Sequence, residues 1–265
     1  MKKQKLMMIG GIALLLLIAG IFMVVKSKKT AEVPAATQKK KLSLPTNIIP
    51  LEDRPYITIE PLADGHNLQI HAYNLRKEAT TMEYELEYQA GTLLQGAFGE
   101  TNLDKLPTTT KILLGSCSAG GACTYHEEVQ GGSLLTRYVG GEDPYALKSD
   151  WKYIDNKAKN VAFTSKDAKF QIDGKPLAQQ RYLVIFNAPG YPDKAPGTIV
   201  SEIYSLATSS SLTGEAILTI RANEETAGMQ IASWDGTTWK KHQSQIDGKM
   251  VTATVPLTEL YMVVK

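Results

Sequence analysis

The chain has 265 residues with 29 basic and 27 acidic side chains, so its formal charge at pH 7 is only +2. The positive charge gathers in residues 1–41, where Glu32 is the one acid, and the remainder is mildly acidic. Such a body lacks the basic surface that nucleic-acid binding requires, so we expect no nucleic-acid partner.

The first predicted element is a transmembrane helix at residues 6–25, which follows a short N-terminal tail at residues 1–5. Its twenty residues carry no charge, and as a helix they would be about 30 Å long, the thickness of the bilayer hydrocarbon. The run is longer than the apolar core of a signal peptide, and lysines follow it at once, which favours an uncleaved signal anchor. We therefore expect a single-pass protein of the cell membrane, with the lipid bilayer as the partner of residues 6–25.

Residues 26–54 predict a flexible linker that contains lysine and proline and shows no apolar periodicity. The simple interpretation is a spacer between the membrane and a folded body. The alternative is that Lys39, Lys40 and Lys41 contact a membrane or polyanion, such as anionic lipid headgroups or cell-wall polymers.

From about Tyr56 onward, apolar residues alternate with polar ones in short runs, as in half-buried strands. The clearest run is residues 82–88, MEYELEY, in which methionine, leucine and two tyrosines alternate with three glutamates. Asp-Gly pairs at 173–174, 235–236 and 247–248 separate such runs and predict hairpin turns. No run of helical length has a convincing amphipathic period.

These strands predict a mainly β fold with two antiparallel β-sandwich domains of Ig-like type after the transmembrane helix. Domain 1 is expected at residues 55–152 and domain 2 at residues 160–265, because the polar segment 149–160 interrupts the strand rhythm.

The C-terminal segment, residues 197–265, resembles the ZU5-like β-sandwich modules of bacterial membrane-anchored surface proteins. The residues that carry the resemblance are Trp234, Asp235, Gly236, Trp239, Asp247, Gly248 and the strand Val251–Val255. Residues 55–150 loosely resemble an Ig or fibronectin-type sandwich. The resemblance implies a spacer or a protein-contact module, and it transfers no catalytic residue.

Cys117 and Cys123 are the only cysteines, and glycines between them let the chain turn back. Lysines on both flanks of the apolar run leave its orientation open. We expect the C-terminal body outside the cytoplasm because of its composition and its two cysteines. There the pair predicts a disulfide, and closing its loop of about seven residues contributes roughly 2 kcal/mol. Two alternatives remain: a zinc site that includes His126, and a catalytic cysteine with His126 as its base.

The sequence contains no convergent catalytic set and predicts no cofactor and no metal site, although calcium binding by acidic loops stays open. The best candidate for a binding loop is the rigid segment NAPGYPDKAPG, which would present Tyr191 between Pro189 and Pro192.

We therefore expect a non-catalytic extracytoplasmic binding, adhesion or envelope-scaffold protein, with an unidentified protein or polysaccharide partner at the cell surface. The first alternative is a membrane-anchored hydrolase or carbohydrate-active enzyme, which would need two carboxylates about 5–10 Å apart in a cleft. The second is a subunit of a secretion or pilus-like envelope assembly, with the helix as an assembly contact.

Overall fold

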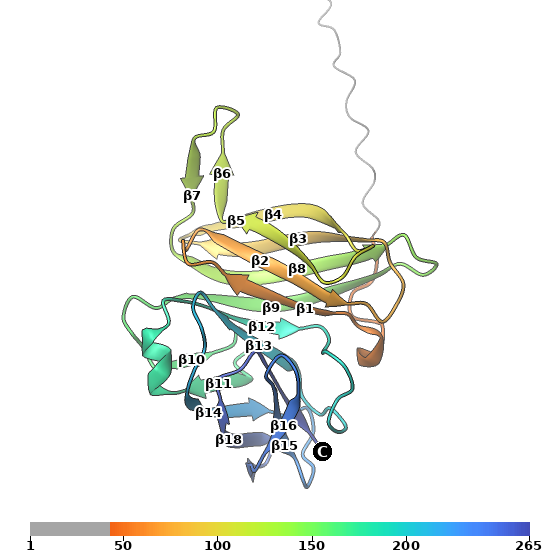
Figure 1. The fold of residues 1–265 in the computed structure, drawn as a ribbon, viewed down its shortest axis with the longest axis vertical. Helices are drawn as coiled ribbons and strands as arrows, with labels where there is room; N and C mark the ends of the chain where they lie inside the picture. The colour runs from red at the N-terminus through yellow and green to blue at the C-terminus, as the bar shows by residue number, and fades with distance from the viewer. Residues whose placement is uncertain (1–42) are drawn as a thin grey trace, which may run out of the picture. The chain divides into compact units, whose positions relative to one another are not determined.

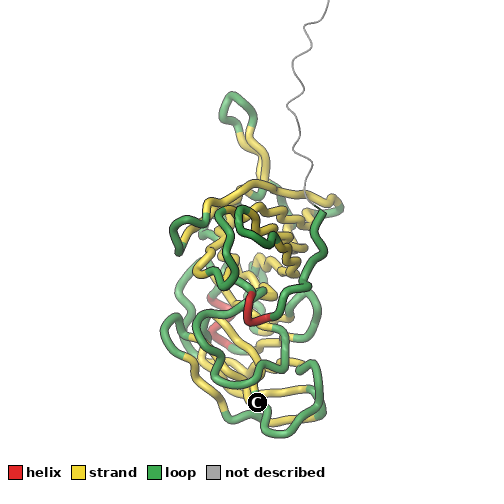
Figure 2. The backbone as a smooth tube through the Cα atoms, turned by 90° about the vertical axis from the view of Figure 1, so that its right-hand side faces the viewer, coloured by secondary structure: helices red, strands yellow, loops and turns green. Residues whose placement is uncertain are grey.

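Antiparallel strands dominate the computed structural model of the protein, which describes residues 43–265 (Figure 1). The predicted transmembrane helix at 6–25 and the lysines Lys39–Lys41 lie outside the described residues. Within residues 43–265, no helix is long and apolar enough to cross a bilayer. The helical segments of this range are two short 3-10 turns, η1 (Leu51–Asp53) and η2 (Lys175–Gln179), drawn in red in Figure 2.

The largest sheet has nine strands, and its order is not the order of the chain. From one edge to the other it contains β16 (Trp239–His242), β15 (Gln230–Trp234), β19 (Leu260–Val264), β13 (Ile203–Thr208), β12 (Tyr182–Ala188), β9 (Tyr145–Asp155), β8 (Val129–Val139), β3 (Thr81–Ala90) and β4 (Leu93–Asn102).

Two smaller sheets and a two-stranded hairpin complete the fold. The three-stranded sheet has the order β1 (Tyr56–Pro61), β2 (Asn67–Asn74), β5 (Thr108–Leu113), and the hairpin pairs β6 (Gly115–Cys117) with β7 (Cys123–Tyr125). The five-stranded sheet has the order β10 (Ala162–Thr164), β11 (Phe170–Asp173), β14 (Glu215–Arg221), β18 (Met250–Pro256), β17 (Gln245–Asp247).

Two hydrophobic cores lie on opposite faces of the long sheet. One contains the inward side chains of β1, β2 and β3, and the other those of β11, β14 and β18. Strand β12 contributes to both, because Val184 and Phe186 belong to the first core while Leu183 and Ile185 belong to the second. Burial on both faces explains the continuous apolar sequence of this strand.

The strand predicted at 82–88 is confirmed as part of β3, whose Met82, Leu86 and Tyr88 are buried. Its partner β4 forms one edge of the long sheet, where Leu94 and Phe98 are 70% and 78% exposed. Directly opposite residues share a face, and Phe98 lies opposite Glu85, so β4 turns these apolar side chains away from the core.

Two of the three predicted Asp-Gly hairpins are confirmed. Asp235-Gly236 connects β15 to β16, and Asp247-Gly248 connects β17 to β18. The third prediction is wrong, because Asp173-Gly174 is followed by η2, and β11 pairs with β10 and β14 rather than with β12.

The end of the predicted linker belongs to the folded body. Asn47 donates its amide to the carbonyl of Ala146 at 3.0 Å, and its side chain exchanges two hydrogen bonds with the backbone of Lys148. Residues 44–265 form one compact unit. Strand β9 extends into the segment 149–160 and pairs with β12 in the same sheet, so the strands on either side of the expected domain boundary are hydrogen-bonded neighbours.

Candidate functional site

The hairpin β6–β7 projects from the body and is the most prominent exposed element of Figure 1. Its tip consists of the small residues 118–122, and nearly all of its side chains are exposed. The amide of Ser118 donates to the carbonyl of Ala122 at 2.8 Å, and the amide of Gly121 donates back to Ser118 at 2.9 Å. Gly121 has φ +83°, a conformation that suits glycine at a tight turn.

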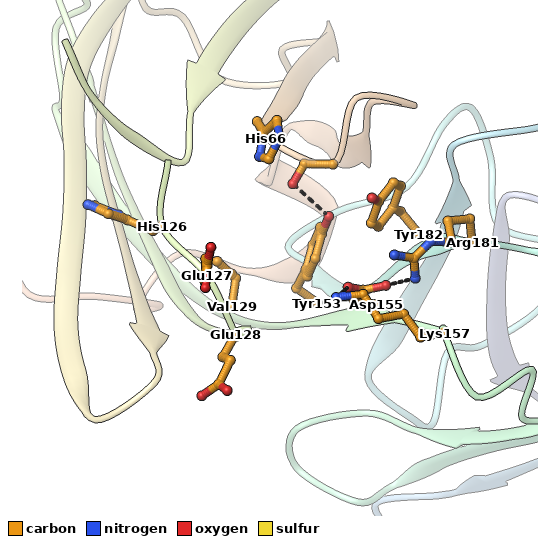
Figure 3. Close-up of a pocket in the computed structure, with 11 residues that line it drawn as sticks. His66, His126, Glu127, Glu128, Val129, Tyr153, Asp155, Lys157, Arg181 and Tyr182 are labelled. Carbon is orange, nitrogen blue, oxygen red and sulfur yellow. Dashed lines mark hydrogen bonds and ion pairs between the residues drawn. The ribbon is translucent and has the colours of Figure 1, made fainter. Parts of the chain in front are cut away.

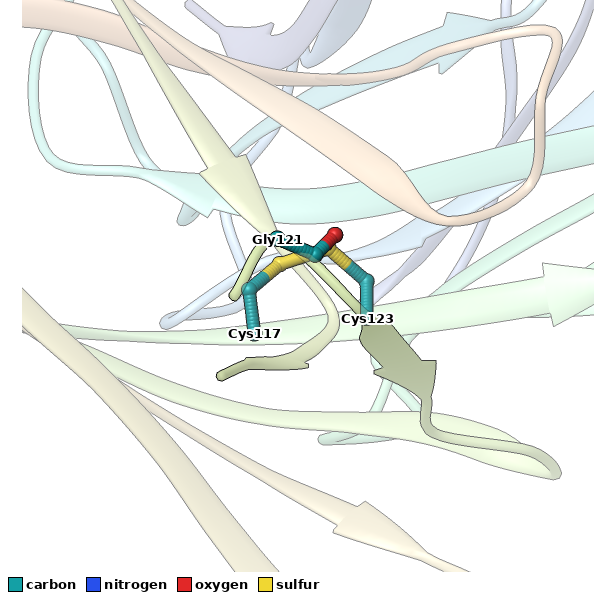
Figure 4. Close-up of a disulfide and its surroundings, with 3 residues drawn as sticks. All are labelled: Cys117, Gly121 and Cys123. Atoms are coloured by element: carbon teal, nitrogen blue, oxygen red, sulfur yellow. A yellow bond between two sulfur atoms is a disulfide. The ribbon is translucent and has the colours of Figure 1, made fainter. Parts of the chain in front are cut away.

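The predicted disulfide is confirmed, since Cys117 and Cys123 are bonded to each other directly across the hairpin (Figure 4). Their Cα atoms are 4.0 Å apart, and the carbonyl oxygen of Gly121 lies 3.8 Å from the sulfur of Cys123. Both sulfurs are therefore consumed in the bond. Neither is available as a zinc ligand or as a resting nucleophile with His126, so these two alternatives are not supported.

A pocket of 480 Å³ opens at the base of the hairpin (Figure 3). We call it the hairpin-base pocket; its lining includes the residues labelled in Figure 3, which are His66, His126, Glu127, Glu128, Val129, Tyr153, Asp155, Lys157, Arg181 and Tyr182. The ring of His66 stacks on Tyr125 of β7 at 4.0 Å between centroids, so the hairpin and the rim of the pocket are in direct contact.

Aromatic side chains form one wall of this pocket. Tyr153 of β9 and Tyr182 of β12 stack at 6.0 Å, and the Tyr153 hydroxyl donates to the carbonyl of Gly65 at 3.2 Å. A side chain at Gly65 would collide with the Tyr182 ring, and φ is +70° there, so both space and backbone conformation require glycine. Burial raises the pKa of Tyr153, which therefore stays a neutral donor.

Charged side chains on the same side are paired with one another. Asp155 forms ion pairs with Arg181 and with Lys157, the latter at 3.1 Å. The Arg181 guanidinium also lies over the Tyr182 ring, 4.7 Å from its centroid. The carboxylate of Asp155 is therefore engaged by two cations at this side of the pocket.

His126 lies across the pocket from this cluster, as Figure 3 shows. Its Nδ1 is 2.9 Å from the hydroxyl of the core residue Tyr88, and its amide donates to Leu114 at 2.9 Å. The ring is thereby oriented by a phenol rather than by a nucleophile or a carboxylate. Within residues 43–265, no group of three or more His, Cys, Asp or Glu side chains is arranged to hold a metal ion.

The predicted binding loop adopts a different arrangement from the one expected. Tyr191 is only 9% exposed, and the Arg76 guanidinium lies 4.6 Å from its ring centroid. Arg76 also donates to the carbonyls of Tyr191 and Asp193 at 3.0 and 2.8 Å, and Pro189 is buried while Pro192 is half-buried. The prediction that Tyr191 is presented to a partner is therefore wrong, because this loop is fixed to the body.

The sequence did not indicate the residues of the hairpin-base pocket as a group. They come from loops and strands between residues 65 and 182, and the local signals were Cys117 and Cys123 in the adjacent hairpin, with His126 considered only as a partner of these cysteines. Comparisons with protein-family models, with curated protein sequences and with solved structures find no match to this chain.

Proposed function

We propose that this chain is a non-catalytic binding protein that a helix at residues 6–25 holds on the outer face of the cell membrane. Its contact surface is the hairpin β6–β7 together with the hairpin-base pocket, and its partner is a protein or polysaccharide of the cell surface. The observation that carries this proposal is the disulfide across an exposed, projecting hairpin.

The disulfide supports both parts of the proposal. Such bonds persist in oxidising compartments and are rare in the cytosol, which favours an extracytoplasmic body. The bond closes a loop with a sequence separation of 6, too small to hold the sheets together, so its effect is local. A hairpin held in one conformation loses less entropy on binding than a free loop does.

The pocket chemistry favours binding over hydrolysis. A glycosidase of the usual kind needs one carboxyl group that stays protonated and a second one that is free to react. In the hairpin-base pocket, Asp155 is engaged by Arg181 and Lys157, and the other two carboxylate residues of the lining, Glu127 and Glu128, are exposed to solvent. Paired charges next to the aromatic wall instead suit the recognition of a polar surface.

The same proposal accommodates the expected pair of sandwiches. The three-stranded sheet covers one face of the long sheet and the five-stranded sheet covers the other, each with its own core. On this interpretation the two sandwiches share the central strands β12, β13 and β19 instead of being joined by a linker.

The topology is tested by labelling the full-length protein in intact cells with a membrane-impermeant maleimide. We expect no labelling before reduction and labelling of Cys117 and Cys123 after it, because both thiols form the disulfide on the accessible side. A variant with both cysteines replaced by serine controls for nonspecific labelling. Labelling that requires cell lysis and no reductant would contradict the proposal.

The contact surface is tested by placing a photo-crosslinking amino acid at Ala119 in the hairpin tip, with Ala178 in η2 as the matched control. We expect crosslinks to an envelope protein or polysaccharide from Ala119 alone, and their loss when both cysteines are replaced. Equal crosslinking from both positions, or none from Ala119, would overturn the role of the hairpin.

A further inference from the structure

A second pocket, of 460 Å³, lies away from the hairpin, where β1 passes over β13. Its lining comes from β1, β2, β13 and the segment that follows β13, from the turn between β15 and β16, and from the turn before β19. The volume lies within the range of small-molecule sites in proteins. We call it the acidic pocket, because its lining contains Glu60, Asp235 and Glu259 and no basic side chain.

Hydrogen bonds keep the carboxyl groups of this pocket in place. Glu259 accepts from the Tyr56 hydroxyl at 2.5 Å, and Glu60 lies 3.0 Å from Nε2 of His71. Hydrogen bonds from the backbone and side chains of Thr238 and Thr237 lower the pKa of Asp235, so it is ionised at neutral pH. The pocket therefore has a negative potential that selects a positively charged ligand.

One hydroxyl group of the pocket lacks a hydrogen-bond partner. Ser205 is fully buried at 0% exposure, and its Oγ has no partner among the described residues. Buried hydroxyls in proteins almost always have a partner, and an unpartnered one needs an explanation. A ligand that carries polar groups next to its positive charge would supply the missing partner.

A metal ion does not fit this arrangement, since within residues 43–265 no three carboxylates or histidines come close enough together to ligate one. The pocket instead has room for an organic cation. Tyr73, stacked on Tyr56 at 4.8 Å and 37% exposed, adds a partly exposed aromatic wall. Burial, with the nearby charge of Glu259, raises the pKa of Tyr73 to about 12, so its hydroxyl remains protonated.

We propose that the acidic pocket binds a protonated amine on a polyhydroxylated ring, that is, an amino sugar. Its ammonium group meets the carboxylates of Glu259 and Glu60, and one of its hydroxyls pairs with Ser205. Charge-assisted hydrogen bonds to the two carboxylates provide the selectivity. This site is separate from the hairpin-base pocket, and its test does not depend on the function proposed there.

The test measures binding of glucosamine to the full-length protein in detergent at about pH 6, below the pKa of a typical amine. Glucose, which lacks the amine, and N-acetylglucosamine, whose nitrogen is uncharged, are the matched ligands. We expect glucosamine to bind about tenfold more tightly than either, the change that one lost charged hydrogen bond produces. Equal affinity for the three sugars, or no binding of glucosamine, would overturn the proposal.

Three variants test whether glucosamine binds in this pocket or elsewhere on the surface. Glu259→Gln should weaken glucosamine binding about tenfold, whereas Glu224→Gln, at an exposed ion pair with Lys265, should leave it unchanged. Ser205→Ala removes a hydroxyl without a protein partner, so the protein should fold while binding weakens several-fold. Unchanged affinity in Ser205→Ala, or equal effects of the two glutamate variants, would contradict the assignment, and Ser205→Ala decides alone if Glu259→Gln does not fold.

Discussion

Asp167 is a single residue that connects two sheets. Its carboxylate accepts hydrogen bonds from the Ser165 hydroxyl at 2.5 Å, from Nδ2 of Asn187 at 3.0 Å, from the Tyr204 hydroxyl at 2.9 Å and from the amide of Lys169 at 3.2 Å. It thus ties the turn between β10 and β11 to the strands β12 and β13. Burial acts to raise the pKa of Asp167, but these hydrogen bonds outweigh it and lower the pKa.

A lowered pKa means that the ionised carboxylate stabilises the folded protein above the unfolded-state pKa and that this stabilisation is lost as the pH falls. We predict that Asp167→Asn lowers the free energy of unfolding by about 1–3 kcal/mol at neutral pH. The difference from wild type should shrink below the reference pKa of 3.8. Urea denaturation at neutral and acidic pH measures it, with Asp143→Asn at an exposed ion pair as the control; a difference that does not change with pH would refute this account.

At the scale of single elements, the close pairing of β8 with β3 and β9 requires glycine at two positions of β8. Gly131 has φ +99°, and the pairing of β3 with β8 shifts register next to it. A Cβ at Gly132 would lie 2.0 Å from the carbonyl oxygen of Glu87. No real atom pair tolerates this distance, so a side chain would push β8 away from β3.

We predict that Gly132→Ala destabilises the protein by more than about 2 kcal/mol, because the strand must move to accommodate the methyl group. Gly120→Ala in the hairpin tip is the matched control. There the nearest atom to a new Cβ is 3.8 Å away, and the change should stay within about 0.5 kcal/mol. Thermal or chemical denaturation of both variants tests the contrast, and equal stabilities would show that β8 can adjust.

Local sequence patterns predicted those elements whose conformation depends on residues close to them in the sequence. The alternation in residues 82–88 identified β3 because one of its faces is buried and the other carries glutamates. The Asp-Gly pair at 173–174 failed as a hairpin signal because η2 begins directly after it at Lys175, with Pro176 in its first turn. Tyr191 was assigned to an exposed loop because Arg76, which covers its ring, lies 115 residues earlier in the chain.

At the scale of the whole molecule, the long sheet unites strands that are distant in sequence. Strand β13 pairs with β12 on one side and with β19 on the other, and β15 pairs with β19 and β16. The alternation of apolar and polar residues does not predict which strands pair, because any antiparallel partner is compatible with the same alternation. The hairpin-base pocket and the acidic pocket both arise from this order, which is why local sequence patterns predicted the disulfide but neither pocket.

The open edge of β4 has a consequence for the behaviour of the protein at high concentration. An edge strand of ten residues offers unpaired backbone groups to a second molecule, and its Leu94 and Phe98 lie two residues on either side of Gly96. Two such edges aligned in opposite directions about Gly96 would set each leucine opposite the phenylalanine of the other molecule. The native protein should therefore self-associate reversibly in concentrated solution.

We predict that Phe98→Lys suppresses this self-association, because a lysine on an edge strand opposes pairing with another edge. Ile217→Lys is the control: it is also an exposed apolar residue, but its strand β14 has a partner on each side. Light scattering over a concentration series should then fall for the first variant and match wild type for the second. If both variants scatter as wild type does, the edge of β4 is not the surface through which these molecules associate.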